Sequence, residues 1–246
     1  MRLRRAHYDL SSSFYDRVIA LHSGDASARL RDLLIERTGV LAGGMLLDLC
    51  TGTGAVALPA GRTTEPERLV VGLDFSLGMI RRAREKAARS GIAGVAFVVA
   101  DASRLPVAPA NLDAVSCSHA MYELQPEACG RTPAEARRAL RPGGQFVMME
   151  HCEPSRPLAR FLYGLRVLAL GSSGNPEFAR DEVPFLRRFF VDVINELSPT
   201  GGRHQNARAA RRGLGREHRT GWTSRRTAEV GKDPVPGQRI GARIDR

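Results

Sequence analysis

The sequence predicts an α/β fold in which helices cover both faces of a parallel sheet. Five short apolar runs follow one another along the chain, and segments with helical spacing separate them. Strands that are buried on both faces have this continuous apolar character, whereas half-exposed strands alternate. The five runs span residues 45–50, 69–74, 95–101, 112–120 and 145–152.

Length and composition agree with one such domain that carries appendages. The chain has 246 residues, of which 43% are hydrophobic, and this is enough for one sizeable core. No apolar run approaches the roughly 18 residues of a membrane helix, and the basic N-terminus lacks the apolar segment of a secretory signal. We therefore expect a globular protein of the cytoplasm.

The four cysteines are scattered along the chain, without metal-ligand spacing to one another or to a histidine pair. This pattern predicts neither a disulfide framework nor a metal site. We expect ordinary packing thiols, three of them as small apolar residues of strands. The cysteines are Cys50, Cys117, Cys129 and Cys152.

Two helices have clear ends in the sequence. Apolar spacing predicts one helix over about residues 25–37, which Gly39 would stop. Another helix follows the second apolar run, with Ser76 as its N-cap and Gly91 at its end. The charged residues of this second helix are expected to form its solvated face.

The crossovers around the first and fourth runs differ in how well they are specified. Thr132 and Glu135 form a capping box around Pro133, which predicts that a helix begins there. After the first run, Pro59 falls close behind Gly54, so the helix there is expected to be short or kinked.

Polar residues and glycines follow the ends of the first four apolar runs. In an open parallel sheet, ligands bind at the carboxyl ends of the strands. A glycine pair after one strand and an acid at the end of the next together predict the ribose site of a nucleotide-like cofactor. The residues concerned are Thr51–Gly54 with Asp48 before them, Asp74, Asp101–Ala102 and Ser118–His119.

Two cofactor classes fit a glycine pair followed by an acid. A dinucleotide usually lies on G-x-G-x-x-G, but Cys50 stands in the first glycine's place and no third glycine follows at the expected spacing. S-adenosylmethionine has no phosphate and needs backbone contacts, a ribose acid and an adenine-edge acid instead. Asp48–Gly54, Asp74 and Asp101 supply these, which favours a methyltransferase over a NAD-binding oxidoreductase.

Five motifs in order carry a family resemblance: LLDLCTGTGAVAL, VVGLDFSLGMIRRAREKA, VVADASRLPV, LDAVSCSHAMYEL and ALRPGGQFVMMEHCEP. From about Tyr8 to Gly202 the chain resembles the class I S-adenosylmethionine-dependent methyltransferases, most closely the ubiquinone/menaquinone biosynthesis C-methyltransferases. The resemblance implies a doubly wound, Rossmann-like sheet. It also implies an N-terminal helical lid at residues 1–40, with Tyr8 and Tyr15 as candidate lid residues, and a cofactor-binding domain at 41–202.

The resemblance further implies a role for each motif residue. Thr51, Gly52, Thr53 and Gly54, with Asp48 before them, would line the methionine end of the cofactor. Asp74 would hold the ribose, Phe75 and Met79 would flank the adenosine, Asp101 and Ala102 would meet the adenine, and Ser118 would lie beside the cofactor. A small-molecule methyl acceptor is implied, and no metal.

The acceptor side departs from the family. Where the family continues the fourth strand as Gly-Leu-Arg-Asn-Val, this chain has Ala-Met-Tyr-Glu-Leu, so Tyr122 and Glu123 replace the Arg and the Asn. This departure bears on the acceptor and not on the cofactor. For a phenolic or quinol ring, ionising the hydroxyl activates the ring carbon, and the candidate bases are His119 first, then His151 and Glu123.

The C-terminal segment 203–246 carries most of the formal net charge of +11. Residues 201–246 contain eleven Arg and one Lys against four acids, which leaves +3 for the rest. We expect a disordered basic tail, which keeps an RNA-binding or RNA-modifying enzyme open as an alternative, beside a non-catalytic scaffold. The segment "RHQNARAARRG" has no apolar alternation, so the sequence does not decide whether the family's seventh strand is present. An altered reading frame near Gly202 would also produce the abrupt change of composition there.

Overall fold

The computed structural model describes residues 29–40, 43–62, 69–151, 157, 182–197 and 204–211. Contacts divide the chain into Met1–Leu214 and Gly215–Arg246, and all described residues lie in the first unit. Several expectations therefore fall outside the described residues. They are the lid residues before 29, Cys152, and the basic tail from 212 onward.

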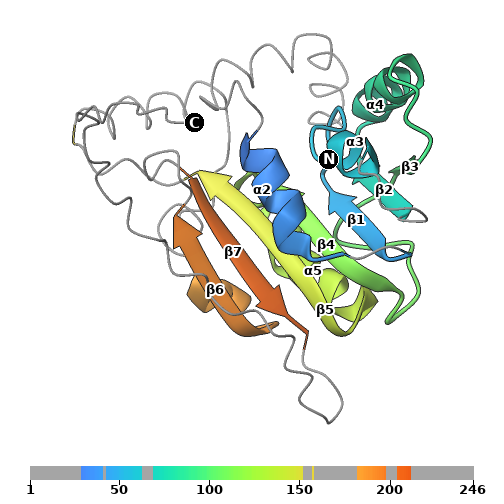
Figure 1. Ribbon diagram of the computed structural model, residues 1–246. Helices are drawn as coiled ribbons and strands as arrows, with labels where there is room; N and C mark the ends of the chain where they lie inside the picture. The colour runs from blue at the N-terminus through green and yellow to red at the C-terminus, as the bar shows by residue number, and fades with distance from the viewer. Residues whose placement is uncertain are drawn as a thin grey trace, which may run out of the picture. The chain divides into compact units, whose positions relative to one another are not determined.

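The described residues form one seven-stranded sheet with the order β3-β2-β1-β4-β5-β7-β6 (Figure 1). Strands β1 to β5 are parallel, whereas β7 runs antiparallel to its neighbours β5 and β6. The predicted parallel α/β sheet is confirmed. The strands are β1 (Met45–Leu49), β2 (Leu69–Asp74), β3 (Val95–Val99), β4 (Leu112–Ser118), β5 (Leu140–His151), β6 (Val191–Leu197) and β7 (His204–Ala210).

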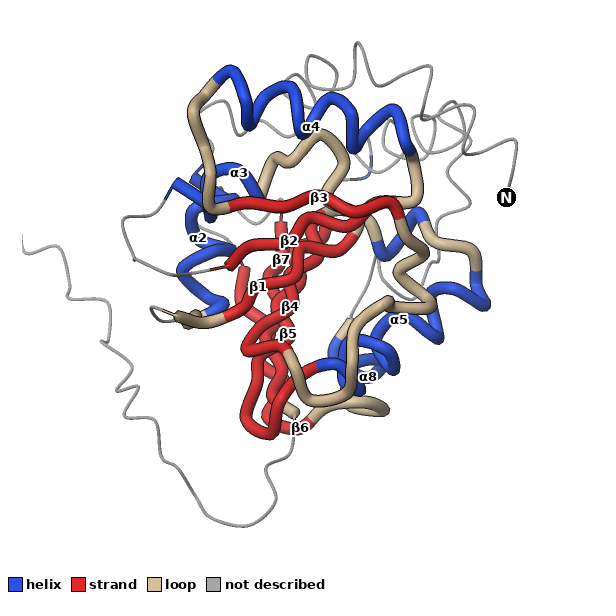
Figure 2. Tube along the Cα trace, turned by 90° about the vertical axis from the view of Figure 1, so that its right-hand side faces the viewer, coloured by secondary structure: helices blue, strands red, loops and turns tan. Residues whose placement is uncertain are grey.

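Helices cover both faces of the sheet, as Figure 2 shows. One face carries α2 (Arg29–Thr38), α3 (Ala57–Arg62) and α4 (Leu77–Arg89). The other face carries α5 (Pro126–Ala139) and α8 (Val183–Leu186). A short 3-10 helix, η1 (Met121–Glu123), follows β4.

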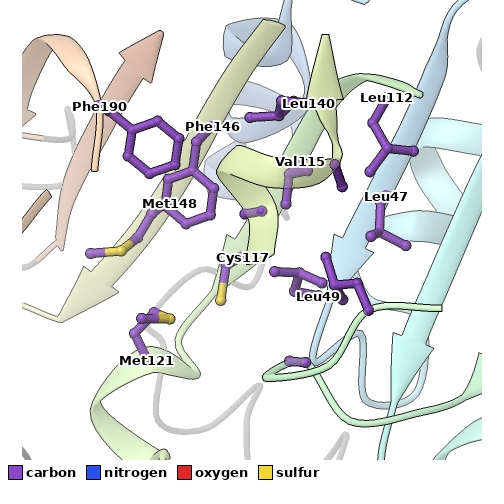
Figure 3. Packing of buried hydrophobic residues seen from close by; sticks show 14 of the residues in the cluster. Leu47, Leu49, Leu112, Val115, Cys117, Met121, Leu140, Phe146, Met148 and Phe190 are labelled. Atoms are coloured by element: carbon purple, nitrogen blue, oxygen red, sulfur yellow. The ribbon is translucent and has the colours of Figure 1, made fainter. Parts of the chain in front are cut away.

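Side chains of the central strands alternate between two hydrophobic cores. On β5, Phe146 and Met148 belong to the core under α5 and α8, whereas Val147 and Met149 belong to the core under α2, α3 and α4. This alternation follows from the period of two in a strand. The Phe146 ring stacks on that of Phe190 with centroids 5.1 Å apart, which closes the first core near β6 (Figure 3).

The predicted C-terminal end of α2 and both predicted ends of α4 are confirmed. The Ser76 hydroxyl accepts a hydrogen bond from Met79 N at 3.2 Å, as an N-cap does. Gly39 and Gly91 follow their helices with φ of 60° and 64°, the left-handed conformation that ends a helix. Helix α3 is six residues long and contains Pro59, so the expected short helix is present.

The predicted start of the crossover helix at the Thr132–Glu135 capping box is wrong. Helix α5 begins at Pro126, and Pro133 lies inside it. The Thr132 hydroxyl donates to Ala128 O at 2.8 Å, and Glu135 binds Arg138 instead of capping the helix. Pro126 fits the first turn of a helix as well as Pro133 does. The residues between the two prolines include the buried Cys129 and Thr132, which pack as part of the same helix.

The seventh strand, which the sequence left open, is present at His204–Ala210, within the segment that was expected to be a disordered tail. Strand β7 lies between β5 and β6, with a register that runs from Gln145↔Ala210 to His151↔His204. Its backbone is hydrogen-bonded on both sides, and this pairing needs no apolar alternation in the strand. The change of composition at Gly202 therefore does not end the sheet.

Candidate functional site

The carboxyl ends of β1, β2 and β3 are tied together by backbone hydrogen bonds. Thr51 N, just after β1, donates to Leu73 O of β2 at 2.9 Å. Ala100 N, just after β3, donates to Asp74 O of β2 at 3.0 Å. The strand order reverses between β1 and β4, and the crevice at such a reversal is where α/β sheets bind ligands.

The loop after β1 has a glycine-like backbone at every second residue. Cys50, Gly52 and Gly54 have φ of 53°, 55° and 84°. A Cβ on Gly54 would lie 2.9 Å from Leu58 Cγ, so a side chain would also clash there. Glycine at such positions lets the backbone approach a ligand closely.

Asp48 is a buried carboxyl under this loop. Thr51 Oγ1 donates to its Oδ2 at 2.6 Å, and Ser116 Oγ of β4 donates to its Oδ1 at 2.8 Å. The pKa of Asp48 is raised to about 6, mainly by burial and to a smaller extent by the nearby Asp74, although the Thr51, Ser116 and Ala57 hydrogen bonds lower it. Asp48 therefore joins the ends of β1 and β4 beneath the loop.

Asp74 connects the end of β2 to the glycine loop and to helix α4. Its Oδ2 accepts from Gly52 N and its Oδ1 from Ser76 N, each at 2.9 Å. These bonds fix the plane of the carboxylate. A carboxylate oxygen can accept more than one hydrogen bond, as a ribose site beside these backbone bonds requires.

The residues predicted for the adenosine side follow β2 and β3, and Ala102 among them is a core residue. Asp101 Oδ1 accepts from Ser103 N and Ser103 Oγ, each at 2.8 Å, which fixes the turn after β3. Ala102 packs into the core. Met79 is buried at the start of α4, and Phe75 is half-buried between Asp74 and the helix.

The turn after β4 presents the predicted acceptor side. Ser118 ends the strand opposite Met149 of β5, and both Ser118 and His119 are half-buried. His119 has φ of 51°, and its N–H donates to Met149 O at 2.8 Å. Tyr122 and Glu123 lie in η1, so two of the three candidate bases share this turn, and the side chain of His151 is not described.

Sequence reasoning missed Lys86, which was assigned to the solvated face of α4. Its Nζ donates to Thr53 Oγ1 at 2.9 Å and to Thr53 O at 3.3 Å. It also missed Gly72 of β2, where a Cβ would lie 2.7 Å from the Phe97 ring and 2.9 Å from Thr51 Oγ1. Gly72 carries a local signal, as a glycine inside an apolar strand indicates close approach.

Glu150 of β5 is the other residue that sequence reasoning missed. It is 1% exposed, and its Oε1 accepts from Met121 N at 2.8 Å and from Ala120 N at 3.2 Å. Burial holds the pKa of Glu150 well above its usual range, and Glu182 and Glu123 raise it further, against the two hydrogen bonds.

Among the residues that the structure describes, no three or more His, Cys, Asp or Glu gather as they would around a metal ion. No helix in this part of the chain is long and apolar enough to cross a membrane.

The strand order and the site define the class of protein. A solved structure with the same fold is phosphoethanolamine N-methyltransferase 2 of Haemonchus contortus in complex with S-adenosyl-L-methionine. The TM-score is 0.58 and the identity 17%, and the match covers 76% of this chain and 53% of that one. The fold is that of the class I S-adenosylmethionine-dependent methyltransferases.

Sequence comparison gives the family. Residues 46–144 match the family model described as a methyltransferase domain. The chain is 33% identical over 171 residues to the ubiquinone/menaquinone biosynthesis C-methyltransferase UbiE of Geobacter sulfurreducens, covering 68% of this chain and 66% of that protein. It is 32% identical over 197 residues to the demethylmenaquinone methyltransferase of Beutenbergia cavernae, covering 78% and 75%. The chain belongs to this family of methyltransferases, whose cofactor is S-adenosylmethionine.

The residues present fit that cofactor. It contains a ribose, which the fixed Asp74 carboxylate suits, and an amino acid end, which can approach the backbone closely at Gly52 and Gly54. It carries a cationic sulfur rather than phosphates, and the acids at the ends of β1 and β2 agree with that charge.

Proposed function

We propose that the chain methylates a small quinol or phenol ring, with S-adenosylmethionine bound at the ends of β1 to β4. The observation that carries the proposal is the 2.9 Å hydrogen bond from Gly52 N to Asp74 Oδ2, which sets a ribose acceptor beside the glycine loop. The ring class is supported by two relatives, which are named as a ubiquinone/menaquinone C-methyltransferase and a demethylmenaquinone methyltransferase.

In this proposal the residues fixed around the loop hold the cofactor. Asp74 accepts the ribose hydroxyls, and Asp101 meets the adenine edge. The loop backbone binds the amino acid end, above Asp48. The remaining contacts come from Thr51, Gly52, Thr53, Gly54, Phe75, Met79, Ala102 and Ser118.

In this proposal the turn after β4 binds the methyl acceptor and supplies the base. The cofactor supplies an electrophilic methyl group on a sulfonium. His119 takes the proton of the ring hydroxyl, which raises the electron density on the adjacent ring carbon. That carbon forms the new C–C bond as the S–C bond breaks, and the ring proton then leaves to water. Alignment of the carbon with the methyl group contributes much of the rate.

The chain's own departure from the family shapes the acceptor pocket. Tyr122 and Glu123 stand where the quinone methyltransferases carry Arg and Asn. A phenol and a carboxyl at these positions favour an acceptor that offers hydroxyl donors over one that carries a negative charge.

Calorimetric titration with S-adenosylhomocysteine tests the cofactor site. We expect binding by the wild type and a Kd about 100-fold higher for Asp74→Ala, because charge-assisted bonds to two hydroxyls are lost. Asp32→Ala removes an exposed acid of α2 and is the matched control. Binding of NADH in place of S-adenosylhomocysteine would overturn the proposal.

The rate of methyl transfer to chemically reduced 1,4-naphthoquinone tests the acceptor side. We expect His119→Asn to lower kcat at least about 100-fold and to leave S-adenosylhomocysteine affinity unchanged, since a general base contributes about that much. Asn is chosen because it tolerates the positive φ at this position. A variant with the wild-type rate would show that His119 is not the base.

A further inference from the structure

The carboxyl end of β5 binds three successive backbone N–H groups of the turn after β4. His119 N donates to Met149 O at 2.8 Å. Ala120 N and Met121 N donate to the same oxygen, Glu150 Oε1, at 3.2 and 2.8 Å. Two adjacent residues of β5 therefore fix the backbone of this turn, about thirty positions earlier in the chain.

The side chain of Met121 gives the turn a second anchor. It is fully buried and packs in the same core as Cys117 and Met148 (Figure 3). The backbone is thus bound by Glu150 on one side, and the core holds a side chain on the other. Directly before these anchors His119 keeps its left-handed conformation, which persists only when its surroundings determine it.

Burying a carboxyl costs desolvation free energy, even when the group accepts two hydrogen bonds. Glu150 is 1% exposed, and its Oε2 has no hydrogen-bond partner among the described residues. Desolvation disfavours such a group, and an apolar residue would suit the core better. The two hydrogen bonds to the turn are therefore what Glu150 contributes to the site.

We propose that Glu150 is a positioning residue for methyl transfer, which holds the His119 turn at the acceptor side through its hydrogen bonds to Ala120 and Met121. The inference rests on the proposed function, because it takes that turn as the acceptor side. Glu150 acts through the backbone of the turn and does not touch the reacting atoms.

The role depends on an acceptor oxygen and not on a charge, which makes Gln the informative substitution. The amide oxygen of Glu150→Gln can accept both N–H bonds, whereas Glu150→Met keeps a similar volume without an acceptor. Glu127→Gln, at an exposed acid of α5, is the matched control.

The experiment uses the full chain and measures S-adenosylhomocysteine affinity together with kcat and KM for reduced 1,4-naphthoquinone. We expect Glu150→Met to lower kcat at least about 30-fold, with cofactor affinity within about twofold, since a small misplacement of reacting groups costs about that much. We expect Glu150→Gln to keep kcat within about threefold. Wild-type kcat in Glu150→Met, or equal losses in both variants, would overturn the proposal.

Two further measurements decide the remaining outcomes. If Glu150→Met does not fold, Glu150→Asp replaces it, because the shorter side chain cannot reach both N–H groups. Hydrogen exchange of the Ala120 and Met121 amides is independent of the acceptor. If the wild type does not methylate the ring, the acceptor class is wrong. In that case, faster exchange in Glu150→Met but not in Glu150→Gln supports the positioning role, and unchanged exchange overturns it.

Discussion

The two sides of the site are built in different ways. On the cofactor side, Asp48 bonds to Thr51 three residues later, and Asp74 bonds to Ser76 two residues later. On the acceptor side, the turn after β4 is held by Met149 and Glu150, about thirty residues away. The cofactor side thus combines bonds within three residues with bonds between strands, such as Ser116 to Asp48, whereas the acceptor turn depends on the pairing of β4 with β5.

This difference determines what each side tolerates. Backbone atoms and short polar side chains form the cofactor loop, so adding a larger side chain there should distort the loop and weaken cofactor binding. The acceptor turn is held by one buried carboxyl and one buried methionine, so it suffers when an anchor is removed. Substitutions of each kind should therefore separate cofactor binding from methyl transfer.

The largest effect is expected from Gly72→Val, beneath the cofactor loop. A Cβ there would lie 2.7 Å from the Phe97 ring and 2.9 Å from Thr51 Oγ1, so both must move. We expect the free energy of unfolding to fall by about 3 kcal/mol, the upper end of the usual overpacking penalty. Urea denaturation measures this, and cofactor affinity should be lost together with stability.

Gly130→Ala is the matched control for this prediction. A Cβ on Gly130 of α5 meets no atom within 4 Å, and Ala favours a helix over Gly. We expect a gain of about 0.5–1 kcal/mol and unchanged cofactor affinity. If Gly72→Val were as stable as the wild type, the loop would be more adaptable than its close contacts indicate.

The next effect concerns pH and Asp48. Its folded pKa is about 6 against an ordinary 3.8, so between these values the folded state holds a proton that the unfolded state releases. The free energy of unfolding therefore falls as pH rises from about 4 to about 6. At 1.36 kcal/mol per pKa unit, the change from this group is at most about 3 kcal/mol.

Asp48→Asn should remove this contribution, because an amide does not ionise. From pH 6 to pH 4 the denaturation midpoint of the wild type should rise relative to that of the variant. Asp32→Asn, at an exposed acid, serves as the control. Parallel curves across this range would show that Asp48 titrates near its ordinary pKa.

Local patterns predicted the parallel part of the fold. The continuous apolar runs became strands buried under two layers of helices, and Ser76 and Gly91 marked the ends of α4 because caps act within a few residues. Strand β7 escaped prediction because its partners β5 and β6 define it. The start of α5 was misplaced because two prolines each satisfy the rule for a first turn.

The site divides in the same way. Asp48, Gly52 and Asp74 were predicted to lie together because they end neighbouring strands, and the structure joins them. Glu150 stood inside an apolar run, where nothing in the sequence reveals the turn that it binds. Lys86 was hidden among the other charges of α4, because an amine that reaches a distant loop has no sequence signature.

The smallest effect is expected from Lys86, whose Nζ bonds to Thr53 Oγ1 at 2.9 Å. Because Thr53 lies between Gly52 and Gly54, this amine steadies the cofactor loop from outside the local motif. We expect Lys86→Met to raise the Kd for S-adenosylhomocysteine about fivefold, which corresponds to about 1 kcal/mol for a lost hydrogen bond to a charged donor. Calorimetric titration measures this shift.

Arg81→Met, at an exposed residue of the same helix, should leave the Kd unchanged. Equal affinities in all three proteins would mean that the loop keeps its shape without the Lys86 bond, through the hydrogen bonds that Asp48 and Asp74 make.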